Sequence, residues 1–170
     1  EWFVETMKVA YANACVNWIV KIHPANIVKN MRDGVGSEPS ELTAIRSLGG
    51  SPPPHVHIIQ PDSRLSTLSL YSVMDYCVTV RGTVGIEAAS FGIPVLTAGT
   101  GRYDRLGFTV DSESRGQYLD RLAHIQDLPS LTARERELAE RFAYGVFIAR
   151  PLTLRAVALE YQRDAKASLQ

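Results

Sequence analysis

The amino-acid sequence predicts an α/β fold, a doubly wound, Rossmann-like parallel sheet. Short, continuous apolar runs recur along the chain, and segments with helical periodicity separate them. Continuous apolar runs are typical of parallel strands buried on both faces. Right-handed crossovers between such strands place helices on both sides of the sheet.

The first part of the chain predicts two helices and two strands. Residues 2–16 form an amphipathic helix in this scheme, because apolar side chains recur there at helical spacing. Those side chains are Phe3, Met7, Ala10 and Ala14. The apolar runs 18–22 and 56–60 predict strands, and a proline follows each of them. The Gly-, Pro- and Ser-rich residues 31–54 predict a long connection with one short helix over 40–48.

A third helix is predicted from Asp62 or Ser63, both of which are good N-cap residues, to about Met74. A strand over residues 76–80 follows it. This run is apolar and β-branched, which favours a buried strand.

The next unit is predicted as a helix over residues 83–91 and a strand over 94–97. Gly92 between them is a C-cap signal. Beyond Gly107 the sequence predicts no further strands.

Helices are predicted over the rest of the chain. The first is marked by apolar side chains at Tyr118, Leu119, Leu122 and Ile125. The next opens with the capping box Thr132-x-x-Glu135 and has an apolar face of Leu138, Phe142 and Val146. Pro151 then breaks the chain, and a last helix is expected over 152–166.

Composition excludes several classes of function. The 170 residues balance 18 Lys and Arg against 18 Asp and Glu, so nothing in the net charge favours nucleic acid as a partner. No apolar run approaches the roughly 18 residues of a membrane span. Cys15 and Cys77 lie far apart without metal-ligand spacing, which favours a reduced, cytoplasmic setting. The chain also lacks the glycine motifs of nicotinamide and P-loop nucleotide sites.

No metal site is predicted. His55 and His57 alternate on one strand edge, but no third Cys or acidic ligand accompanies them. The chain has no Asp-x-Asp pair that would hold a sugar nucleotide through a divalent ion.

Candidate binding residues follow the predicted strands. Ligands of doubly wound sheets bind outside the carboxyl ends of the strands. At those ends the sequence places His23, Gln60, Arg81 and Gly99.

The stretch RGTVGIEAAS (81–90) carries the strongest binding signal. Its small residues Gly82, Thr83, Val84 and Gly85 open a helix and leave backbone N–H groups accessible to a phosphate. Arg81 and His23 would add positive charge. Glu87 lies one helical turn after Thr83, where its carboxylate can accept hydrogen bonds from the vicinal hydroxyls of a ribose.

Structural explanations of the same residues remain open. A glycine-rich turn also allows a strand and a helix to pack closely. Glu87 in the first turn would offset the helix dipole, as acidic residues often do. His23 before a proline is compatible with a hydrogen-bonded loop histidine.

Two segments, KIHPAN and VHIIQPDSRLSTLSLYSVMDYCVTVRGTVGIEAASFGIPVLTAGTGRYDRLGFTVD, carry a family resemblance. Their motifs are His23-Pro24, then Thr83-x-Gly85-x-Glu87, then Gly92-x-Pro94-Val95, and finally Gly99 with Tyr103, Gly107 and Thr109. Over residues 21–111 the chain resembles the C-terminal, donor-binding half of bacterial capsule polysaccharide biosynthesis proteins. These are GT-B-type glycosyltransferases, and their best-known members are capsule Kdo transferases that use CMP-Kdo.

The resemblance implies roles for individual residues. His23 and Glu87 would act at the reaction centre, His23 on the donor phosphate and Glu87 on the nucleotide ribose. Backbone next to Gln60 would contact the base, and Arg102 and Tyr103 would lie on a loop over the donor sugar. The full implied donor-binding set is His23, Gln60, Arg81, Thr83, Val84, Gly85, Glu87, Gly99, Arg102 and Tyr103.

The resemblance also implies an organisation and partners. Residues 1–150 would form the nucleotide-sugar-binding domain, and 151–170 a helix packed toward an N-terminal acceptor domain outside this chain. The chain is accordingly expected to be a piece of a longer protein, inactive alone. The nucleotide sugar is its substrate, and no cofactor is implied. Lipid-linked acceptors lie at the membrane, so the resemblance is compatible with peripheral membrane association of the full-length protein.

Two other functions remain open. One is a UDP-GlcNAc 2-epimerase-like isomerase, which shares the architecture and resembles the chain around residues 85–95; the segment GRYDRLGFT fits the capsule proteins better. The other is a non-catalytic scaffold domain of a polysaccharide-export assembly. The presence of His23, Thr83 and Glu87 together counts against a scaffold, because a domain that no longer binds a ligand has no physical reason to retain all three.

Overall fold

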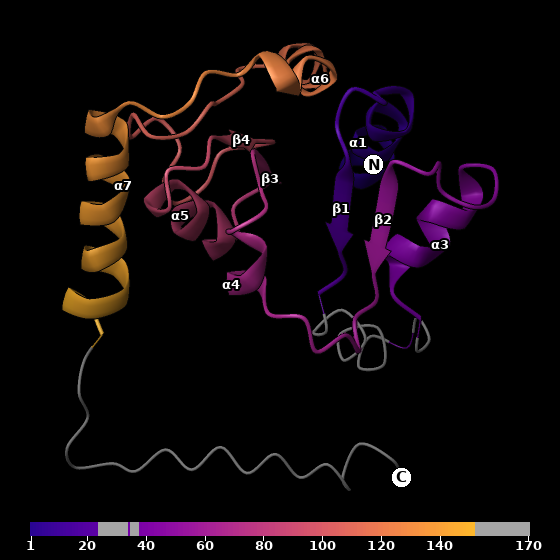
Figure 1. Ribbon diagram of the computed structural model, residues 1–170, viewed down its shortest axis with the longest axis horizontal. Helices are drawn as coiled ribbons and strands as arrows, with labels where there is room; N and C mark the ends of the chain where they lie inside the picture. The colour runs from indigo at the N-terminus through magenta and orange to yellow at the C-terminus, as the bar shows by residue number, and fades with distance from the viewer. Residues whose placement is uncertain (24–33, 35–37, 152–170) are drawn as a thin grey trace, which may run out of the picture.

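The computed structural model describes residues 1–23, 34 and 38–151, which form a mixed α/β fold (Figure 1). Its elements in chain order are α1 (Trp2–Ala12), β1 (Trp18–Lys21), α3 (Ser40–Ser47), β2 (Val56–Ile59), α4 (Thr67–Leu70), β3 (Cys77–Thr79), α5 (Thr83–Ser90), β4 (Val95–Thr97), α6 (Arg115–Ala123), the 3₁₀ turn η1 (Ile125–Asp127), α7 (Ala133–Tyr144) and the π-helical turn η2 (Gly145–Ala149).

The strands described form two separate parallel pairs, β1 with β2 and β3 with β4. In the first pair, Trp18 lies opposite Val56 and Lys21 opposite Ile59. In the second, Cys77 lies opposite Val95 and Thr79 opposite Thr97. Each parallel pair is joined by a crossover that contains a helix, as parallel strands require. The predicted α/β class with parallel strands is confirmed at this level.

The β3–β4 pair is covered on both faces. Cys77 and Val95 pack in a cluster with residues of α5 and α7, together with the buried rings of Tyr103 and Phe108. The alternate side chains, among them Leu96, pack on α6 in a second cluster. Both faces of this strand pair are therefore buried, as the continuous apolar runs in the sequence predict.

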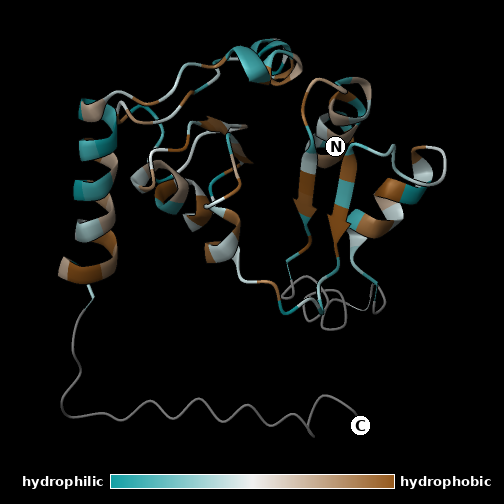
Figure 2. Cartoon of the chain, in the orientation of Figure 1, coloured by the Kyte–Doolittle hydropathy of each residue, from teal (hydrophilic) through white to brown (hydrophobic). Residues whose placement is uncertain are grey.

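The β1–β2 pair is covered on one face among the described residues. Val56 packs there with Met7 of α1 and Ile45 of α3. On the opposite face Ile19 is 44% exposed, beside its register partner His57, which is also exposed. Figure 2 shows apolar colour on these strands.

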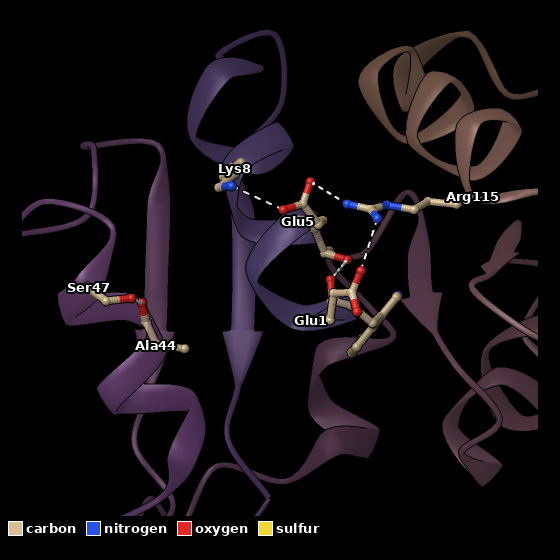
Figure 3. Close-up of polar contacts among 8 residues, drawn as sticks. Glu1, Glu5, Lys8, Ala44, Ser47 and Arg115 are labelled. Atoms are coloured by element: carbon tan, nitrogen blue, oxygen red, sulfur yellow. Dashed lines mark hydrogen bonds and ion pairs between the residues drawn. The ribbon is translucent and has the colours of Figure 1, made fainter.

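Helices α1 and α6 join the two strand pairs. The hydroxyls of Thr6 and Tyr118 are hydrogen-bonded at 2.9 Å in the interior. At the surface, Arg115 forms ion pairs of 3.0 Å with Glu1 and 3.2 Å with Glu5, the second of which also binds Lys8 (Figure 3). Surface pairs of this kind contribute little, so the buried contacts determine the association.

Gln126 connects the amino ends of β1 and β3. Its side-chain oxygen accepts a hydrogen bond of 3.0 Å from Asn13, which precedes β1. Its backbone carbonyl accepts one of 3.0 Å from the hydroxyl of Tyr76, which precedes β3. Gln126 is therefore bonded to a residue in the segment before each of the two strands.

Three predicted elements differ from the structure. The helix predicted from Asp62 or Ser63 to Met74 is wrong in extent: only Thr67–Leu70 is α-helical, and Ser66 caps it by accepting from the N–H of Leu68. The helix predicted over 2–16 ends at Ala12, because Asn13 adopts extended angles. Past Gly107, Val110 forms a single parallel bridge with Leu96 beside β4.

The C-terminal helices agree with the sequence where they are described. Thr132 and Glu135 form the predicted capping box at the start of α7. Figure 2 shows α7 hydrophilic over its first turns and apolar toward η2. The helix predicted over 152–166 lies outside the described residues, and so does the predicted C-terminal segment 151–170 apart from Pro151. Among the residues described, no helix is both long and apolar enough to cross a membrane.

Candidate functional site

The turn between β3 and α5 presents a free helix start. Gly82 is the N-cap residue of α5 and has no side chain with which to cap it. Within the described chain, the N–H groups of Thr83 and Val84 have no protein partner. Thr83 and Arg81 are both exposed. Unpaired N–H groups at a helix start, with a hydroxyl and a guanidinium beside them, are suited to an anion.

The small size of Gly85 has a different cause from the one expected. Tyr103 is 2% exposed, and its hydroxyl donates a hydrogen bond of 2.7 Å to the carbonyl of Gly82. A Cβ on Gly85 would stand 2.3 Å from that hydroxyl and 3.0 Å from the methyl group of Thr79. Gly85 therefore makes room for Tyr103 beneath the turn. In the structure Tyr103 supports the turn from inside, with its side chain almost fully buried.

The loop that follows β4 packs directly on the turn. A Cβ on Gly101 would stand 2.8 Å from the Cβ of Arg81. The N–H of Gly101 is bound at 2.6 Å by the carboxylate of Asp104. The structure thus brings Arg81 together with the loop that carries Gly99 and the exposed Arg102.

Glu87 lies in the second turn of α5 and is half-buried. It is therefore not the first-turn carboxylate that the dipole explanation requires. The hydroxyl of Tyr71 donates a hydrogen bond of 2.9 Å to Glu87 Oε2. Burial first, and then this hydrogen bond, raise the pKa of the Tyr71 phenol well above its usual value. The phenol consequently keeps its proton and acts as the donor.

Cys77 lies in the same core. Its side chain is 4% exposed, and burial, with a smaller contribution from the charge of Glu87, raises the pKa of its thiol to about 12. A protonated, buried thiol is a packing group and is chemically inert at neutral pH.

His23 and Gln60 lie at the carboxyl ends of the other strand pair, and both are exposed. The carbonyl of Ile59 accepts from the N–H of Ile22 at 3.0 Å, and that of Gln60 from the N–H of Ser63 at 3.1 Å. Each of these two carbonyls therefore has one hydrogen-bond partner within the fold and keeps a second lone pair.

One side-chain link runs from the β1–β2 pair toward Glu87. Lys21, at the end of β1, donates hydrogen bonds of 2.6 Å to the carbonyl of Leu65 and 3.2 Å to the hydroxyl of Thr67. Thr67 begins α4, and Tyr71 at its C-cap reaches Glu87. Helix α4 thereby connects the carboxyl end of β1 with α5.

A cavity of about 250 Å³ lies beside the loop after β4. It is lined by Gly99, Thr100, Asp104, Arg105, Asp111, Ser112 and Glu113. A larger cavity of about 520 Å³ shares Gly99 and continues between the starts of α1 and α6. Of the predicted site residues, Gly99 lines both cavities, whereas His23, Arg81, Thr83 and Glu87 line neither.

The smaller cavity has little capacity for an anion. It contains three carboxylates against the single guanidinium of Arg105. Asp111 is already occupied: it accepts from the hydroxyls of Thr97 at 2.7 Å and Thr109 at 2.8 Å, and from the N–H of Arg105 at 2.7 Å. A phosphate would meet repulsion here, so the turn before α5 is the better anion site.

Within the part of the chain that the structure describes, no three His, Cys, Asp or Glu side chains are placed to share a metal ion. The ring of His55 lies 3.1 Å from the carbonyl of Ala10, whereas His57 is on the exposed face of its strand.

Sequence reasoning missed Tyr71 and Gly101. Tyr71 lies 16 residues before Glu87, and only folding brings them together. Gly101 is one of several glycines in a loop, and no spacing marks it as the one that contacts Arg81.

Comparisons of the chain with protein-family models, with curated proteins and with solved structures found no match.

Proposed function

We propose that this chain is the donor-binding part of a nucleotide-sugar-dependent glycosyltransferase that acts in capsule or surface polysaccharide synthesis. The observation that carries the proposal is the pairing of an uncapped helix start at Thr83 and Val84 with a half-buried, oriented carboxylate at Glu87. The helix start would bind a phosphate group, and the carboxylate would bind the nucleotide ribose. The motif resemblance over residues 21–111 is what suggests that the ligand is a nucleotide sugar.

The chemistry requires a stabilised leaving group. An acceptor hydroxyl attacks the anomeric carbon of the donor, and the bond from that carbon to the phosphate oxygen breaks. The nucleotide leaves with the bonding electron pair, and N–H groups with nearby cations stabilise its charge. Here Thr83, Val84 and Arg81 would supply that stabilisation, with His23 from the neighbouring strand pair. The base that removes the acceptor proton would belong to a domain outside this chain.

The two strand pairs would then be halves of one doubly wound sheet. In support, Gln126 is hydrogen-bonded both to Asn13, which precedes β1, and to Tyr76, which precedes β3, and α1 packs on α6. In such a sheet the carboxyl ends of β1 and β3 would also share an edge, where His23 and Arg81 would face one ligand.

Nucleotide titration tests the proposal. CMP, UDP, GDP and ADP are titrated into the labelled chain, and amide NMR shifts are followed. Shifts at Thr83 to Glu87 with CMP are expected for a capsule-type CMP-sugar enzyme. The same shifts with UDP would redirect the proposal to a UDP-sugar transferase or epimerase.

A charge-removal variant sharpens the result. Arg81→Met is expected to weaken the binding of the nucleotide, because it removes the guanidinium next to the helix start. Arg134→Met is the matched control, since Arg134 is an exposed arginine on α7 whose partner is Glu137. Folded chain that binds none of the four nucleotides at millimolar concentration would contradict donor binding by this chain.

A further inference from the structure

The contact between Tyr71 and Glu87 joins two elements with fixed geometry. Tyr71 is 7% exposed, and its ring stacks on Phe91 with centroids 5.0 Å apart and planes inclined by 23°. Its hydroxyl donates to Glu87 Oε2 at 2.9 Å. The ring is therefore held on its face by Phe91 and at its tip by the carboxylate, which restricts both side chains.

The Glu87 carboxylate keeps capacity for a ligand. A carboxylate offers about four acceptor directions on its two oxygens. Tyr71 occupies one direction on Oε2, and Oε1 has no hydrogen-bond partner among the residues that the structure describes. The carboxylate is half-buried, so a ligand that reaches it would meet an acceptor already held in one orientation.

The direction of the hydrogen bond is settled by the phenol. A phenol with its ordinary pKa of about 10 is already neutral at physiological pH, and burial raises the pKa of Tyr71 further, so its hydroxyl donates. Glu87 is the acceptor, and its remaining directions also accept. The complementary ligand groups are therefore hydroxyl donors rather than phosphate oxygens.

We infer, on the basis of the proposed function, that Tyr71 is a positioning residue that fixes the Glu87 carboxylate to accept from the 2′-hydroxyl of a ribonucleotide. The consequence is selectivity for ribonucleotides over 2′-deoxyribonucleotides. A preorganised acceptor gains from a hydroxyl that it can bind, and it is left partly unpaired by an analogue that lacks the hydroxyl.

Tyr71→Phe tests this role with little change in packing. Phenylalanine keeps the ring that stacks on Phe91 and removes only the hydroxyl. Tyr76→Phe is the matched control, because it also removes a hydroxyl with one protein hydrogen bond, to the carbonyl of Gln126, and does not touch Glu87. The dissociation constants of CMP and 2′-deoxy-CMP are measured by NMR titration for wild type and both variants. If wild type binds UDP or another nucleotide instead of CMP, the same titrations are made with that nucleotide and its 2′-deoxy form in place of CMP and 2′-deoxy-CMP.

The expected results separate positioning from general stability. Wild type should bind the ribonucleotide about tenfold more tightly than the 2′-deoxy form, which is the range of one hydrogen bond to a charged group. Tyr71→Phe should weaken ribonucleotide binding about three- to tenfold and leave the 2′-deoxy form within about twofold. Tyr76→Phe should change neither constant.

Equal losses for both nucleotides in Tyr71→Phe would overturn the inference, because they would show a purely structural role. Unchanged constants in that variant would overturn it as well. In either case the nucleotide still binds wild type, so the proposed function would stand. Failure of wild type to bind any nucleotide is the separate result that removes the proposed function and, with it, this inference.

Discussion

The hydroxyl of Tyr103 donates a hydrogen bond of 2.7 Å to the carbonyl of Gly82, so the loop after β4 supports the turn before α5 from the interior. Tyr103 also packs on Phe108 and Phe142. The turn is thus held by the aromatic core that joins α5 to α7, and its exposed side remains available to a ligand.

Gly85→Ala is expected to destabilise the protein by about 3 kcal/mol, because the new methyl group would overlap the Tyr103 hydroxyl and force a repacking of the core. Tyr103→Phe removes the hydroxyl and should cost about 1 kcal/mol for the lost hydrogen bond. The double variant should lose less than the sum of the two, since Tyr103→Phe removes the hydroxyl that the new methyl group would overlap. Chemical denaturation of the three variants measures these free energies of unfolding.

Gly116→Ala is the control for the glycine substitution. Gly116 lies in α6, and its new Cβ would approach only the hydroxyl of Ser114, at 3.9 Å. Alanine should therefore stabilise the helix by up to about 1 kcal/mol. Additive losses in the Gly85 and Tyr103 cycle would show that the two residues do not compete for space.

Asn13→Ala is expected to cost about 2 kcal/mol of stability. The buried Asn13 amide donates to the carbonyl of Ala123 and to Gln126, and its oxygen accepts from the N–H of Cys15, each at 3.0 Å. Alanine removes all three bonds in the segment between α1 and β1. Asn17→Ala is the control, because Asn17 is exposed in the same connection. Equal free energies of unfolding for the two variants would contradict this account.

The two cysteines should differ in reactivity. Cys15 is exposed and Cys77 is buried with a pKa raised to about 12. A thiol reagent at about pH 8 should therefore modify one thiol in the folded protein and the second only on unfolding. Mass spectrometry of the modified peptides identifies them. Rapid modification of Cys77 under native conditions would show that the β3 core opens readily.

The raised thiol pKa also predicts a pH dependence of stability. Below about pH 9 the Cys77 thiol is protonated in both the folded and the unfolded chain, and its contribution to stability is fully present. As the pH rises from 9 toward 12, the thiolate forms in the unfolded chain first, so stability falls by up to about 1.4 kcal/mol per pH unit.

Denaturation at intervals between about pH 8 and 10 tests this dependence. Buried tyrosines add their own effect only as the pH approaches 10, where phenols begin to ionise in the unfolded chain, so the comparison with a Cys77 variant is needed to isolate the thiol. Cys77→Ala should show a flatter profile from a lower starting stability. A profile parallel to that of wild type would assign the pH dependence to other groups.

Local signals predicted several elements closely. The helix predicted over 83–91 is α5, Thr83–Ser90, because Gly82 and Gly92 mark both of its ends. The capping box at Thr132 placed α7 for a similar reason. These signals lie within a few residues of the element that they define, so the sequence displays them directly.

The α4 prediction failed because two competing caps lie close together. Asp62 and Ser63 are good N-cap residues, but the structure uses Ser66. The carbonyl of Leu65 and the hydroxyl of Thr67 are bound by Lys21, which is remote in sequence. A tertiary contact of this kind favours one cap over another, and no local pattern reports it.

The sequence alone determined the succession of short parallel strands and helices and the identity of the exposed turn at Arg81 and Thr83, since hydrophobic periodicity and glycine placement are local. Tertiary structure decided what the residues around that turn do. It placed Tyr103 beneath Gly85 and Tyr71 against Glu87, because burial brings together side chains that are 18 and 16 positions apart in the chain. The exposure of Ile19, on a strand face that the described residues leave open, was likewise decided by packing, because an apolar run does not specify which of its faces is covered.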